Sequence, residues 1–146
     1  MKKLFLTIGL FLASFQIANA CPVISEGAEI NRIYASEMQE DPFYFPVVAG
    51  GQVNLANCGF AGGWVVPNPD FSLYMYDFNG PVQFSVSSPG CDTVLLLNAP
   101  DGSWYYDDDS SGDLMPWIEA YVGDGRMDVW VGTFGGDYCD ASLVVY

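Results

Sequence analysis

The sequence has 146 residues, of which only four are lysine or arginine, eighteen are aspartate or glutamate, and none is histidine. A formal net charge of −14 repels phosphate backbones and anionic lipid, so nucleic acid is excluded as a partner, and cations, sugars or polypeptides are favoured as ligands. Because 51% of the residues are hydrophobic and 16% are aromatic, the chain can still form a packed core.

Residues 1–20 have the pattern of a secretory signal peptide. Lys2 and Lys3 precede an apolar run, and Ala18–Ala20 supply the small residues that signal peptidase accepts. The run is too short to span a bilayer and no second one follows, so no membrane span is expected. We therefore expect a secreted or periplasmic protein whose mature part, residues 21–146, forms one domain with two positive and eighteen negative side chains, a net charge of −16.

Four cysteines remain after export: Cys21, Cys58, Cys91 and Cys139. An even number in an oxidising compartment predicts two disulfides, for which three pairings are possible. We favour Cys21–Cys58 and Cys91–Cys139, which would cross-link the two halves of the chain separately. Cys21 directly follows the expected cleavage site, so its lipidation is an alternative. Lipidation would leave one of the other three cysteines unpaired, which counts against it. No CxxC pair or histidine indicates a zinc site.

Short β-rich runs separated by glycine, proline, asparagine and aspartate occupy the rest of the chain. No segment has a convincing helical period, and residues 31–40 are the nearest candidate. The expected strands cover residues 43–50, 52–56, 70–78, 82–88, 92–98, 103–107, 116–122, 126–134 and 141–146. Runs of this length with such turns predict an all-β fold, an antiparallel β-sandwich or barrel.

Alternation within these runs predicts which side chains face the core. In 126–134, Val129 and Val131 would face inward, and Trp130 would face outward because side chains alternate along a strand. The run 93–98 is apolar on both faces, as in a central strand that is covered on both sides.

The second half of the chain resembles the bacterial pre-peptidase C-terminal domain family. That family has a "D-T-x-L" strand, an "xDGxW" turn, a "DDD" loop with a glycine and a later "G-x-Y-x-V-W-V-G-T" strand. The matching parts are Asp92 to Leu95, Asp101 to Trp104, Asp107 to Gly112 and Gly125 to Thr133. Met127 replaces the family's usual tyrosine, and residues 42–58 and 69–78 match more loosely.

This resemblance implies a jelly-roll-like β-sandwich that is secreted and non-catalytic. Some members of the family bind calcium, and a related group binds collagen. No peptidase domain precedes the module in this sequence, so we expect a stand-alone binding or accessory protein.

The stretch "DDDSSGD" fits the first half of a calcium-binding loop. Oxygens would come from the side chains of Asp107, Asp109 and Ser111 and from the carbonyl of Asp113, with Gly112 at the sharp turn.

The glutamate expected at the twelfth place of such a loop is missing, because Ile118 occupies it. Glu119 follows one residue later, and Asp92 or Asp101 could complete the site from a neighbouring turn. The alternative is an ordinary solvated turn without calcium. The sequence leaves both interpretations open.

Catalysis is not expected, since histidine is absent and the cysteines are predicted to be paired. The alternative to a protein-binding module is a carbohydrate-binding module that stacks sugar rings on exposed aromatic faces. Trp130 is the predicted ligand-binding residue, because its neighbours in sequence take the inner face. Trp104 and Trp117 are expected to pack beneath the acidic loop. An extracellular protein or a polysaccharide therefore remains possible as the partner.

Overall fold

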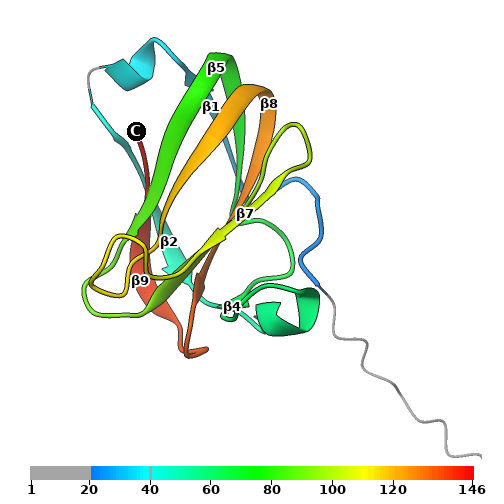
Figure 1. Ribbon diagram of the computed structural model, residues 1–146, viewed down its shortest axis with the longest axis vertical. Helices are drawn as coiled ribbons and strands as arrows, with labels where there is room; N and C mark the ends of the chain where they lie inside the picture. The colour runs from blue at the N-terminus through cyan, green and yellow to red at the C-terminus, as the bar shows by residue number, and fades with distance from the viewer. Residues whose placement is uncertain (1–20, 40) are drawn as a thin grey trace, which may run out of the picture.

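The computed structural model describes residues 21–39 and 41–146, which form a strongly curled β-sheet (Figure 1). The expected signal peptide, residues 1–20, lies outside the described residues. The strands are β1 (Glu29–Tyr34), β2 (Phe43–Ala49), β3 (Val53–Asn54), β4 (Trp64–Val65), β5 (Phe71–Ser87), β6 (Thr93–Asn98), β7 (Trp104–Asp107), β8 (Trp117–Thr133) and β9 (Cys139–Val145). Two 3-10 helices, η1 (Glu37–Gln39) and η2 (Leu55–Cys58), are the helical elements of the described chain. The prediction of an all-β fold is confirmed.

The strands pair in the order β2-β9-β5-β8-β4-β3, with β6 joining β8 to β7 and β1 lying beside β5. All of these pairs are antiparallel except β1–β5, which is parallel. β1, β2 and β7 each pair on one side only, so they form edges of the sheet. Pro46 lies within β2, as expected of an edge strand, where one row of amides has no strand partner.

Strands β5 and β8 are each 17 residues long, because two expected turns are bends inside continuous strands. Their pairing runs as far as Met75 opposite Gly125, shifts register, and resumes with Asn79 opposite Gly123. Asp77 has a φ of 63° in this irregular stretch. Since both strands bend at the same level, the pair forms the arch at the top of Figure 1 and curls the sheet around a common core.

The main core is filled by apolar side chains from the two arms of this arch and from β1, β2, β6 and β9. Val129 and Val131 are buried in it, as predicted. Every residue of β6 is buried, which confirms the expectation of a central strand covered on both faces.

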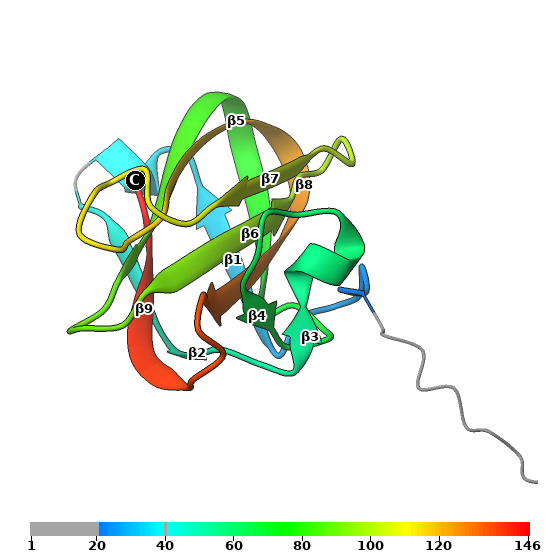
Figure 2. The same cartoon turned by 60° about the horizontal axis from the view of Figure 1, so that its bottom comes forward.

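Trp130 faces away from this main core, as alternation predicts, but the prediction that it is exposed is wrong. Its exposed fraction is 0%, because it packs in a second small core with Leu55, Val65 and Leu96. Strand β4 and helix η2 cover this face of β8 (Figure 2). The binding role predicted for Trp130 therefore has no accessible surface.

Trp104 on edge strand β7 is the more exposed tryptophan of this face, at 39%. Its ring lies 5.5 Å from that of Trp130 and 5.9 Å from that of Phe60. Trp104 therefore covers the second core, rather than packing beneath the acidic loop.

Both predicted disulfides are present. Cys21 and Cys58 join the start of the described chain to η2, and Cys91 and Cys139 join the loop after β5 to the start of β9. Within the described ranges, no helix has both the length and the apolar character that a membrane crossing requires.

Gly132 in β8 allows the second core to form. A Cβ atom there would lie 2.3 Å from the carbonyl oxygen of Trp64 in β4, a backbone atom that cannot turn aside. We predict that Gly132→Ala lowers the free energy of unfolding by about 1–3 kcal/mol, the usual cost of overpacking. Gly123→Ala, in the same strand but with no atom near its Cβ, is the matched control. Urea unfolding of the two variants measures the difference, and equal stabilities would contradict this account of how β4 packs on β8.

Candidate binding cleft at the disulfide end

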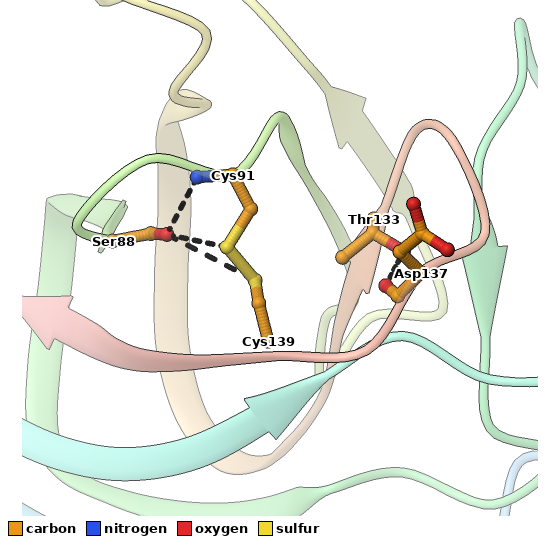
Figure 3. Close-up of a disulfide and its surroundings, with 5 residues drawn as sticks. All are labelled: Ser88, Cys91, Thr133, Asp137 and Cys139. Atoms are coloured by element: carbon orange, nitrogen blue, oxygen red, sulfur yellow. Dashed lines mark hydrogen bonds between the residues drawn. A yellow bond between two sulfur atoms is a disulfide. The ribbon is translucent and has the colours of Figure 1, made fainter.

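The Cys91–Cys139 disulfide (Figure 3) lies at the start of β9, and β9 begins at the end of the molecule opposite the β5–β8 arch (Figure 1). It joins the 88–92 loop to the first residue of β9, with 6.6 Å between the two Cα atoms. The Ser88 hydroxyl lies 2.8 Å from Cys91 Sγ and accepts a hydrogen bond from the Cys91 amide. The two segments are therefore held in a fixed relation.

A cleft of about 510 Å³ opens between these segments and the turn that joins β8 to β9. It is lined by Pro89, Gly90, Cys91, Asp92, Thr133, Gly135, Asp137, Cys139 and Asp140. Thr133 Oγ1 donates a hydrogen bond of 2.6 Å to the carbonyl oxygen of Asp137, which fixes the turn (Figure 3). Three carboxylates line this cleft, and no lysine or arginine does.

Asp92 connects this cleft to the acidic loop. Burial raises the pKa of its carboxyl group above the usual value, and the negative charges of Asp109 and Asp108 raise it further. One carboxylate oxygen, Oδ1, is buried and has no hydrogen-bond partner among the described residues. The acidic loop therefore lies close enough to the cleft for the charges of Asp108 and Asp109 to act on Asp92.

Two aromatic side chains accompany the acids. Phe134 and Tyr138, at the two ends of the β8–β9 turn, are 44% and 61% exposed. Tyr138 is within hydrogen-bonding distance of Gln52, at 3.4 Å between the two oxygens. Exposed aromatic residues beside charge are typical of protein-binding surfaces.

Asp107 has a structural role in the acidic loop. Its carboxylate accepts hydrogen bonds from the amides of Ser110 and Trp117, at 3.0 and 2.8 Å, and from the Ser110 hydroxyl at 2.5 Å. Ser111 donates its hydroxyl to the carbonyl of Met115. Asp107 thus ties the start of the loop to the start of β8.

The other predicted calcium ligands, Asp109, Ser111, Asp113 and Glu119, are all exposed. Glu119 accepts a hydrogen bond from Gln83 on β5. In the described part of the chain, no group of three or more acidic, cysteine or histidine side chains is arranged to hold a metal ion. Calcium also binds carbonyl and hydroxyl oxygens, so a calcium site in the 107–113 loop stays a prediction.

No motif in the sequence singled out Asp137 or Asp140. A signal for Asp140 and for Asp92 was nevertheless present, because each directly follows a cysteine of one predicted disulfide. A disulfide that joins two Cys-Asp pairs must bring the two aspartates to the same end of the fold. The second Cys-Asp pair, at residues 139–140, could therefore have predicted that Asp140 lies near Asp92.

A second groove of about 430 Å³ adjoins the first and shares Asp140 with it. The carboxylate of Asp70, directly before β5, lies here and accepts a 2.8 Å hydrogen bond from the Val131 amide. Burial raises the pKa of Asp70 to about 7; the Val131 hydrogen bond acts against this rise, and the charge of Glu29 adds to it.

Comparisons with protein-family models and with curated proteins give no match. Among solved structures, the chain is similar to PliG of Aeromonas hydrophila, a periplasmic lysozyme inhibitor of g-type lysozyme, at 14% identity and a TM-score of 0.41, over 81% of this chain and 97% of that one. This similarity is too low to support a conclusion about the function of the chain. The resemblance to the pre-peptidase C-terminal domain family likewise stays a prediction.

Asp107→Ala should lower the free energy of unfolding by about 1–2 kcal/mol, because charge-assisted hydrogen bonds to two amides are lost. Asp109→Ala, two residues away and exposed, should change it by less than about 0.5 kcal/mol. Chemical unfolding in a chelating buffer measures both, and equal effects would contradict the structural role of Asp107.

The same variants test the calcium prediction when their melting temperatures are measured with and without calcium. A gain in melting temperature that wild type shows with calcium and that Asp109→Ala abolishes would place the ion in this loop.

Asp70 should make stability depend on pH. Its pKa is raised in the folded state, so the folded chain holds a proton that the unfolded chain releases, and stability falls as pH rises from about 4 to about 7. Asp70→Asn keeps an acceptor for the Val131 amide and should be more stable than wild type above pH 7, by on the order of 2 kcal/mol. Urea unfolding at several pH values, with Asp77→Asn as the charge-matched control, checks this. A constant difference between wild type and Asp70→Asn would show that Asp70 does not titrate in this range.

Proposed function

We propose that the exported chain is a non-catalytic binding module that holds a cationic protein at the disulfide-end cleft. Carboxylates without a neutralising basic side chain are concentrated at one end of the molecule, and this concentration is the main support for the proposal. Asp92, Asp137 and Asp140 line a single cleft with no basic side chain among them. Asp108 and Asp109 lie close enough to raise the pKa of Asp92.

The two positive side chains of the mature chain do not offset this surface. Arg126 is paired with Asp128 at 2.9 Å, and Asp128 is 1% exposed and also accepts a hydrogen bond from Ser72. Arg32 lies in β1, which is not part of the cleft. A partner with positive side chains would therefore find an uncompensated negative field, which speeds encounter and selects against anionic proteins.

The turn beside the cleft suits a protein better than a small ion. Phe134 and Tyr138 are large and exposed, and each directly follows a residue that lines the cleft, Thr133 and Asp137. A lysine or arginine of a partner can stack on such a ring while its charge meets an acid. The Cys91–Cys139 disulfide and the Thr133 hydrogen bond hold the surface in place before binding. A preorganised surface loses less entropy when it binds.

The same elements support an oxidising location outside the cytoplasm. Two disulfides persist where thiols are not kept reduced, and the pattern of residues 1–20 predicts export. We infer that the partner is met in the periplasm or outside the cell.

The test is binding of the mature chain to small cationic proteins, namely a g-type lysozyme, a c-type lysozyme and cytochrome c. We expect binding that weakens steeply between about 50 and 200 mM salt. The double variant Asp137→Asn/Asp140→Asn should weaken the tightest of these interactions roughly tenfold.

The matched control, Asp77→Asn/Asp124→Asn, changes the net charge equally at the opposite, arch end of the fold and should weaken binding by less than about twofold. Isothermal titration calorimetry measures each affinity. Equal losses in the two double variants would show diffuse attraction without a site, and absence of binding by the wild type would overturn the proposal.

A further inference from the structure

The second groove differs from the disulfide-end cleft because its walls are mainly apolar. It lies where the starts of β1, β5 and β9 meet edge strand β2. Pro46, Val47 and Val48 of β2 and Ala141 of β9 form much of its wall. The three acidic residues that line it, Glu29, Asp70 and Asp140, come from three different segments of the chain.

The charged residues that line the groove around Asp70 are all negative. β1 presents Glu29 and β9 presents Asp140, while the residues that β2 contributes carry no charge. From β8, the Val131 amide donates to the Asp70 carboxylate, and the nearby Asp128 is already paired with Arg126. Asp70 is therefore a half-buried acid with one hydrogen bond and no cation beside it among the described residues.

We propose that this groove receives one lysine or arginine side chain of the cationic partner, with its hydrocarbon stem against the apolar wall and its charge at Asp70. The inference rests on the proposed function and adds an anchor point to it. Asp140 lines both the disulfide-end cleft and the second groove. One partner surface can therefore cover the cleft and insert this side chain into the groove at the same time.

Charge complementarity and the apolar wall select this occupant. A long basic side chain has an aliphatic stem that apolar walls favour and a charged end that carboxylates favour. A bare divalent cation would need six to eight oxygen ligands, whereas most of this groove is hydrocarbon. A second copy of the chain would bring its own negative charge and be repelled.

The anchor makes binding sensitive to pH near neutrality. Asp70 is largely protonated below its pKa of about 7 and ionised above it, while lysine keeps its charge throughout this range. The ion pair therefore forms as pH rises, and binding of the cation lowers the pKa of Asp70 in return. Affinity for a basic ligand should increase from about pH 5.5 to about pH 8.5.

The experiment titrates the mature chain with decalysine by calorimetry at about pH 5.5 and about pH 8.5, with Asp70→Asn and Asp77→Asn as charge-matched variants. For wild type and Asp77→Asn, we expect affinity to rise roughly fivefold with pH. At both pH values, Asp70→Asn should bind decalysine with the lower affinity that wild type has at about pH 5.5. Decalysine with acetylated side chains, which lacks the charges, should not bind.

Nuclear magnetic resonance gives a second readout. The Val131 amide resonance follows the ionisation of Asp70, and its titration midpoint should fall when decalysine is present. An unchanged midpoint, or equal affinities of the Asp70→Asn and Asp77→Asn variants at about pH 8.5, would overturn the anchor.

The two proposals can fail separately. If the cationic proteins bind through Asp137 and Asp140 but Asp70→Asn has no effect, only the anchor is wrong. If decalysine binds through Asp70 while no folded cationic protein binds, the groove stands and the proposed function is wrong.

Discussion

The Cys91–Cys139 disulfide holds together two segments that their charges would otherwise separate. Asp92 follows one cysteine and Asp140 the other, so the covalent bond places like charges at a single cleft. In a protein without this link, repulsion among these acids would favour opening of the loops. The bond thus stabilises a local concentration of negative charge, and the proposed binding of a positive partner rests on this concentration.

The bend shared by β5 and β8 determines where this charge lies. Because the two long strands bend at the same level, their four ends return to the opposite end of the molecule (Figure 1). The loops that leave those ends carry Asp70, Asp92 and the acidic loop, and the β8–β9 turn carries Asp137. Curvature of the sheet and the position of the candidate site therefore have the same cause.

The all-β class and most strand positions could be predicted, because alternation and turn residues are local signals. The cysteine count allowed three disulfide pairings, and the one favoured, which cross-links the two halves separately, is the one present. The bends inside β5 and β8 could not be predicted. Residues 79–81 (NGP) and 123–125 (GDG) have the composition of turns, and only the pairing of β5 with β8 keeps each strand continuous. Trp130 was placed on the correct face, but its burial depends on β4, which is distant in sequence. Asp70 was missed because its unusual environment arises from chain segments that meet only in the folded state.

Binding of a cationic protein at the disulfide-end cleft is tested most directly by an amide chemical-shift map of isotopically labelled residues 21–146, mixed with an unlabelled cationic protein such as lysozyme. We expect the amides that shift most to lie in residues 88–92 and 133–140, around the disulfide-end cleft. Shifts concentrated at the arch near Asp77 and Asp124, or spread evenly over the acidic surface, would contradict it.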